Sequence, residues 1–180
     1  MIRSAAIKAE NAAVAWSNAP ARVYHGTTLA HAQLIVSHGI NPRAGRGAAD
    51  FGQGFYVTTT LHQAQQWANQ KVRNLPSHVA GIAAVLSFDL DRDLAAACEH
   101  LTFVLADSDY HDFVLFNRLG SATHGRSGGA AYALVHGPVA AFPQSITYAN
   151  CDQICCIGAN AVAALGAPLG GIATGNPLFP

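Results

Sequence analysis

The chain has 180 residues, of which 51% are hydrophobic and 11% are charged, with ten basic and ten acidic residues. A chain of this length and composition is expected to fold as one domain with a sizeable core rather than remain disordered. Its formal net charge of zero offers no electrostatic footprint for nucleic acid or for an anionic membrane surface.

The N-terminal part predicts an arm, a strand and a helix. Residues 1–20 are rich in alanine and end at a proline, and we expect a helical arm there. Residues 21–24 predict a short strand, closed by a turn over residues 25–28, HGTT. Apolar residues at helical spacing then predict a helix over residues 29–37, with Gly39 as its C-terminal cap.

The next segment predicts a strand that leads into a second helix. A loop containing glycine and arginine is expected over residues 41–49. The stretch DFGQGFYVTTT, residues 50–60, has a glycine-rich entry, an aromatic pair and a β-branched run, which predict a strand. Thr60 and Gln63 have the spacing of a capping box, so a helix is expected over residues 61–73.

The rest of the chain mixes strands and helices. Apolar, β-branched runs predict the strands and helical spacing predicts the helices. Strands are expected over residues 79–90, 132–135 and 154–157, helices over 94–100, 109–119 and 160–165, and a loop over 121–130. The Gly- and Pro-rich tail, residues 166–180, has the composition of turns. The predicted class is α+β, with the main domain over residues 21–165.

Four cysteines, at positions 98, 151, 155 and 156, include no CxxC pair of the kind that binds structural zinc. We expect buried thiols in a reducing compartment and no bound metal. The start of the chain lacks a signal-peptide pattern, and no run approaches the roughly 20 apolar residues of a membrane span. These features predict a soluble, cytoplasmic domain, or a cargo domain that another route delivers.

Three features could carry chemistry. In YHGTT, residues 24–28, a histidine beside a glycine offers ring nitrogens and an open backbone to a ligand, although a turn with a surface histidine also explains it. Gly52 and Gly54 would let the backbone pass close to a ligand beside Tyr56, or they mark a bulged edge strand. Trp67 follows Tyr56 by eleven residues, so the two rings could enclose a flat ligand, or Trp67 belongs to the core.

Taken together, YHGTT and DFGQGFYVTTTLHQAQQWA resemble the ADP-ribosyltransferase superfamily, on its diphtheria-toxin-like, His-Tyr-Glu side. The closest resemblance is to a bacterial group of small domains with a DFGxGFYxTT signature. The later segments NR, GPVA and QICCIGANAVAAL follow in that group's order, so the resemblance covers about residues 22–165. It implies a split pair of small, mostly antiparallel sheets with NAD in the cleft between them.

The resemblance also implies roles for individual residues. His25 would hydrogen-bond the ribose next to the nicotinamide, the Gly26 backbone would hold the carboxamide, and Thr27 would assist at the ribose. Tyr56 and Trp67 would stack on the two faces of the nicotinamide ring. Asp50 would bind the cofactor or structure its loop. The other residues assigned to the NAD site are Gly54, Phe55 and, on the adenosine or phosphate side, Arg46.

The third motif position departs from the family pattern. The superfamily usually places a glutamate there, whereas this chain has only Glu10 and Glu99, and the position falls on Gln153. An amide can still hydrogen-bond the ribose 2′-hydroxyl, but it cannot supply the negative charge that favours positive charge developing on the sugar. The adjacent Asp152 would point to the opposite face of its strand.

The function that the resemblance implies is NAD-dependent mono-ADP-ribosyl transfer, with NAD as co-substrate and His25, Tyr56 and Gln153 as the catalytic residues. The domain would be a toxin or effector that reaches a target cell's cytosol, with a protein rather than nucleic acid as the expected acceptor and a cognate immunity protein as a further partner. Two alternatives stay open. One is NAD hydrolysis by water, and the other is a silent module that only binds NAD or ADP-ribose.

Overall fold

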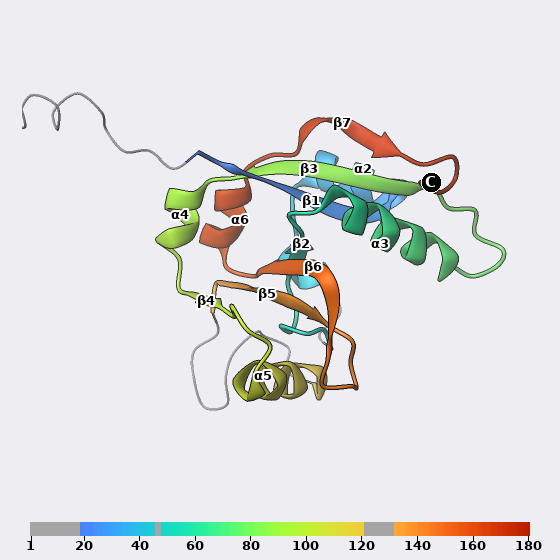
Figure 1. Ribbon diagram of the computed structural model, residues 1–180. Coiled ribbons are helices and arrows are strands. Elements are labelled where there is room, and N and C mark those ends of the chain that lie inside the picture. Colours follow the sequence, from blue (N-terminus) through green and yellow to red (C-terminus); the bar gives the residue numbers. More distant parts are fainter. Residues whose placement is uncertain (1–18, 46–47, 121–131) are drawn as a thin grey trace, which may run out of the picture.

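The computed structural model describes residues 19–45, 48–120 and 132–180 (Figure 1). Most of the expected N-terminal arm, Arg46 and the loop expected over residues 121–130 lie outside these described residues. Within them, no helix is long and apolar enough to cross a membrane.

Two β-sheets form the centre of the fold, and the expected α+β class with two mostly antiparallel sheets is confirmed. The first sheet has the strand order β1-β3-β7, with β1 at Ala21–Thr28, β3 at Ala83–Leu90 and β7 at Leu169–Thr174. The second has the order β2-β6-β5-β4, with β2 at Phe55–Val57, β6 at Thr147–Cys156, β5 at Leu134–Ala140 and β4 at His100–Thr102. Only β4 and β5, among the paired strands of the described residues, run parallel.

Five α-helices and a short 3-10 helix accompany the sheets in the described part of the chain (Figure 1). They are α2 (Leu29–His38), the 3-10 helix η1 (Pro42–Ala44), α3 (Leu61–Arg73), α4 (Arg92–Ala96), α5 (Ser108–Arg118) and α6 (Ala159–Leu165).

Strand β3 is covered on both faces, which explains why its sequence is apolar almost throughout. Alternate side chains of a strand point to opposite faces. Ala83 and Val85 pack against α3, whereas Leu86 and Phe88 belong to the main core, which also takes in Ala32 of α2. The two helices therefore cover opposite faces of the first sheet.

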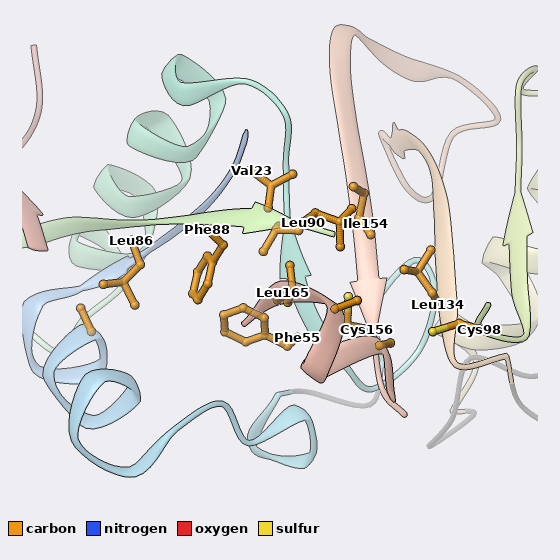
Figure 2. Packing of buried hydrophobic residues seen from close by; sticks show 14 of the residues in the cluster. Val23, Phe55, Leu86, Phe88, Leu90, Cys98, Leu134, Ile154, Cys156 and Leu165 are labelled. Atoms are coloured by element: carbon orange, nitrogen blue, oxygen red, sulfur yellow. The ribbon is translucent and has the colours of Figure 1, made fainter. Parts of the chain in front are cut away.

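The main core fills the space between the two sheets (Figure 2). Val23 and Phe88 come from the first sheet, and Phe55, Ile154 and Cys156 come from the second. A smaller cluster around Phe51, Tyr110 and Val135 lies on the other face of the second sheet, between the sheet and α5.

The two sheets also meet at a backbone bridge between β1 and the residue after β2. The amide of Tyr24 donates to the carbonyl of Thr58 at 2.8 Å, and the amide of Thr58 donates to the carbonyl of Tyr24 at 2.9 Å. Because β1 and β2 are each the first strand in their sheet's order, the split between the sheets runs along them.

The helices expected from periodicity are largely confirmed. α3 spans the expected residues, and α2 extends one residue further than expected before Gly39, whose φ of 83° suits a glycine cap. The capping box expected at the start of α3 is wrong, because the Thr60 side chain makes no capping hydrogen bond. Gln63 instead pairs with the backbone of Asp152, donating to its carbonyl at 2.7 Å and accepting from its amide at 3.1 Å.

Three local expectations are wrong because distant strands pair with the segments concerned. The turn expected over residues 25–28 is the second half of β1, paired with β3. The helix expected over residues 94–100 begins at Arg92 and ends at Ala96, and the chain then enters β4 beside β5. The tail expected to form turns contains β7, which pairs with β3. Propensity read along the chain does not register such partners.

Candidate functional site

The three residues expected to be catalytic lie on three strands that are neighbours in space at the split between the sheets. His25 is on β1, Tyr56 is on β2 and Gln153 is on β6. β2 pairs with β6 in a register that places Tyr56 opposite Cys155, two residues from Gln153. The fold therefore brings together segments that lie 31 and 97 residues apart (56 − 25 and 153 − 56).

The geometry around His25 fixes both its tautomer and its charge. Its Nδ1 lies 2.6 Å from the carbonyl oxygen of Tyr56. Since a carbonyl only accepts, Nδ1 carries the proton and Nε2 is left as an acceptor. Burial, reinforced by the positive charge of Lys71, lowers the pKa of His25 to about 3, and its ring stacks on Phe55 with centroids 4.3 Å apart. At neutral pH this histidine is an uncharged hydrogen-bond acceptor.

The two glycines assigned to the site are required by packing. A Cβ on Gly26 would clash with the backbone carbonyl of Ala64, so glycine allows α3 to lie directly against β1. A Cβ on Gly54 would clash with the Sγ of Cys155 on β6. Both glycines therefore have structural roles, and their role in binding a ligand stays a prediction. Thr27, the next residue of β1, is buried at 2% exposure.

The two aromatic rings expected to enclose the nicotinamide have different surroundings. The Tyr56 hydroxyl donates to the carbonyl of Gly52 at 2.7 Å and accepts from the amide of Phe51 at 3.1 Å, and its ring packs against the smaller cluster. Trp67 projects from α3 with 56% of its surface exposed. The described residues include no ring contact between them, so the stacking arrangement stays a prediction.

A buried carboxylate organises the surroundings of Gln153. Asp50 is 3% exposed, and its Oδ1 accepts from Arg118 Nη2 at 2.6 Å and from Nε at 2.8 Å. Its Oδ2 accepts from the backbone amide of Ala140 at 2.9 Å and from Gln153 Nε2 at 2.7 Å. Gln153 Nε2 also donates its second hydrogen to the carbonyl oxygen of Pro138, at 2.9 Å. Asp50 therefore ties its own loop to α5, β5 and β6.

Asp152 points to the other side of β6, as the alternation of a strand requires. Its Oδ1 accepts from the Thr58 hydroxyl at 2.6 Å and from the Thr59 amide at 3.1 Å, and its Oδ2 lies 3.8 Å from Nε2 of His136. Burial alone would raise its pKa, but these hydrogen bonds outweigh burial and lower the pKa to about 2. Asp152 thus anchors the start of α3 to the second sheet.

Lys71 is a charged group near the site that the sequence analysis did not consider. It follows Trp67 by one helical turn, so both side chains lie on the same flank of α3. The side chain is partly buried, and no ion pair among the described residues includes its ammonium group. Burial lowers its pKa to about 8. Its spacing from Trp67, in a chain with only two lysines, could have pointed to it.

Two hollows open beside the motif segments. One, of about 370 Å³, borders Thr59, Pro138 and Asp152. The other, of about 410 Å³, borders Thr28 and His31, where the HGTT segment enters α2. Neither of these two is lined by the rings expected to hold the nicotinamide.

The cysteines do not offer a nucleophile. All four are free. Cys98, Cys155 and Cys156 are buried as expected, whereas Cys151 is only half-buried, and burial raises the pKa of its thiol. Burial raises the pKa of the Cys155 and Cys156 thiols, the latter to about 12, which keeps them protonated. Among the described residues, no group of three side chains could hold a metal ion.

Comparison with known families places this site within a matched region. A family model described as "Protein of unknown function (DUF3990)" matches residues 21–155. The chain belongs to the DUF3990 family. The match spans most of the chain and includes His25, Tyr56 and Gln153 on their three strands, whereas β7 lies beyond it. A search of the curated proteins finds no match to this DUF3990 chain.

Proposed function

We propose that this DUF3990 chain is an NAD-dependent mono-ADP-ribosyltransferase. The observation that carries the proposal is the placement of His25, Tyr56 and Gln153 on neighbouring strands at the split between the two sheets. The ADP-ribosyltransferase resemblance of the YHGTT, DFGQGFYVTTT and QICCIGANAVAAL segments assigns these same residues to NAD.

In the proposed reaction the bond between the nicotinamide nitrogen and the ribose C1′ breaks first, and nicotinamide leaves with the electron pair. The sugar that remains has oxocarbenium character, and an acceptor nucleophile attacks C1′ and loses its proton. Tyr56 and Trp67 would stack on the nicotinamide. His25 Nε2 and Gln153 would accept hydrogen bonds from the ribose hydroxyls, which orients the sugar for departure of the leaving group.

The charge distribution at the site supports an anionic co-substrate. The ammonium group of Lys71 has no ion-pair partner among the described residues and lies close enough to His25 to depress its pKa. A partly buried cation without a partner favours a ligand that brings negative charge. The diphosphate of NAD is such a group.

NAD hydrolysis is the second candidate, because Gln153 and His25 would orient the ribose in the same way for attack by water. A catalytically silent binding module is the third, and the observation that favours it is the uncharged amide at position 153. The three candidates differ in their products: labelled acceptor with nicotinamide, free ADP-ribose with nicotinamide, or no product.

The test is to incubate the purified protein with NAD and a cell lysate, and to measure nicotinamide release together with label transferred to macromolecules. We expect both, and we expect His25→Gln to reduce kcat/KM by about 10- to 100-fold, the effect of losing one hydrogen bond of roughly 1–3 kcal/mol. The matched control is His38→Gln, at the exposed end of α2.

Each of the other outcomes favours a different candidate. Nicotinamide release with free ADP-ribose and no labelled acceptor would favour hydrolysis. If the protein binds NAD but releases no nicotinamide, even at high protein concentration, the result would favour the silent binding module. Equal activity in His25→Gln and the wild type would contradict the proposed site.

A further inference from the structure

The neighbours of Gln153 dictate which way round its amide lies. Its Nε2 faces Asp50 Oδ2 at 2.7 Å and the carbonyl oxygen of Pro138 at 2.9 Å. A carboxylate and a carbonyl can only accept hydrogen bonds, so the amide nitrogen has to point toward them. Both of its hydrogens are then used, and Oε1 is the atom that Gln153 can offer to a ligand.

Asp50 itself is held firmly enough to impose this orientation. Both oxygens of its buried carboxylate are engaged, Oδ1 by the guanidinium of Arg118 and Oδ2 by the backbone amide of Ala140 as well as by Gln153. The ion pair with Arg118 largely compensates the charge of the carboxylate. Asp50 therefore acts on Gln153 through geometry more than through charge.

The same contacts explain why a glutamine can stand where a glutamate is usual. A hydroxyl of the ribose needs an acceptor, and Oε1 is one. A glutamate at position 153 would instead place a second carboxylate within hydrogen-bond distance of Asp50, and two carboxylates this close cannot both ionise.

We propose that Asp50 is a positioning residue that orients the Gln153 amide so that Oε1 accepts from a ribose hydroxyl of NAD, and that the Asp50–Gln153 pair takes over the hydrogen-bonding role of a single glutamate. This inference rests on the proposed function. It predicts that Gln153→Glu slows the reaction, contrary to what the family pattern alone suggests.

The experiment is a charge-exchange cycle of Asp50→Asn, Gln153→Glu and the double variant, with nicotinamide release as the readout. In Asp50→Asn the new amide nitrogen can face the oxygen of Gln153 instead of its nitrogen. The Gln153 amide then lies the other way round, with its NH₂ group rather than Oε1 toward the ribose. We expect kcat to fall by about 100-fold, which is the effect of displacing a reacting group by about 1 Å. The KM for NAD should change by less than about threefold.

Gln153→Glu is expected to lower kcat as well, and to regain activity as the pH falls, because one of the two carboxylates then takes a proton. The double variant restores one carboxylate and one amide, with their positions exchanged. We expect it to recover at least about tenfold in kcat over either single variant. Asp89→Asn, in the exposed pair with Arg22, is the matched control and should behave as the wild type.

The thermal unfolding temperature of the same four proteins, measured at neutral and acidic pH, tests the pairing without any turnover. Non-additive unfolding temperatures and kcat recovery in the double variant support the inference. The inference would be overturned by a wild-type kcat in Asp50→Asn or by faster turnover in Gln153→Glu at neutral pH. It would also be overturned if the effects of the two single variants simply add in the double variant. If the wild type releases no nicotinamide, the proposed function fails, and the unfolding cycle alone decides whether Asp50 orients Gln153.

Discussion

At the scale of single residues, burial and fixed partners decide which groups are charged. His25 is neutral because burial lowers its pKa to about 3, and its Nδ1 proton is held by the carbonyl of Tyr56. Asp152 keeps its charge although burial would raise its pKa, because its hydrogen bonds outweigh burial and lower the pKa to about 2. The site thus combines a neutral acceptor, a fixed amide and the cation of Lys71.

Lys71 provides a prediction at this scale. Burial lowers its pKa to about 8, so its amine should react with an acylating reagent at a rate that rises around pH 8. Saturating NAD should slow the labelling and move its midpoint to higher pH, because a nearby diphosphate stabilises the ammonium form. Peptide mass spectrometry from about pH 6 to 10 measures the labelling of Lys71. Nα-acetyl-lysine, which has a free ε-amine, is the reference in the same reaction.

A labelling midpoint equal to that of the reference amine would contradict the lowered pKa. Labelling that NAD leaves unchanged would contradict the placement of the diphosphate beside Lys71.

At the scale of elements, Asp152 and Gln63 join α3 to β6. Asp152 accepts from Thr58 and Thr59 at the turn before α3, and Gln63 pairs with the backbone of Asp152. Because α3 carries both Trp67 and Lys71, this junction sets how the helix stands relative to the strand of Gln153.

The junction predicts a pH-dependent stability difference. The folded-state pKa of Asp152, about 2, is below the ordinary value of 3.8, so the carboxylate stabilises the fold above about pH 3.8. That contribution is lost as the pH falls through 2. Asp152→Asn should reduce the free energy of unfolding by about 2 kcal/mol at neutral pH, and the difference from the wild type should shrink between pH 4 and 2.

Denaturant unfolding across this pH range provides the measurement, with Asp112→Asn on the exposed face of α5 as the control. A difference that is absent at neutral pH, or that persists undiminished at pH 2, would show that Asp152 does not act as an ionised anchor.

At the scale of the whole molecule, the C-terminal segment completes the first sheet. β7 pairs with the edge of β3, and Phe179 exchanges two hydrogen bonds with the buried side chain of Asn69 on α3, at 2.8 and 3.1 Å. Leu178 and Phe179 also pack against the face that α3 covers. A segment with the composition of a tail is therefore part of the fold.

Truncation before Leu169 should consequently destabilise the molecule. It would expose the edge of β3 and leave the buried amide of Asn69 without its partners, at a cost of roughly 1–3 kcal/mol for that group alone. We expect a lower thermal unfolding temperature and increased aggregation, measured by calorimetry and light scattering. Leu169→Ala, at an exposed position of β7, is the control. An unchanged unfolding temperature in the truncated protein would contradict a structural role for β7.

The sequence by itself determined the α+β class and the helices α2 and α3, because helical periodicity and a glycine cap are local signals. It also identified His25, Tyr56 and Gln153 as a set, and the fold places them on neighbouring strands. Whether they bind NAD is a prediction that the proposed experiments test.

The tertiary structure alone decided the features that depend on partners far along the chain. The extension of β1 through HGTT, the strand β4 and the strand β7 all arise from pairing with distant backbone. The orientation of the Gln153 amide depends on a carboxylate 103 residues away. The physical reason is the same in each case: a hydrogen bond between distant segments leaves no periodic trace in the sequence around either partner.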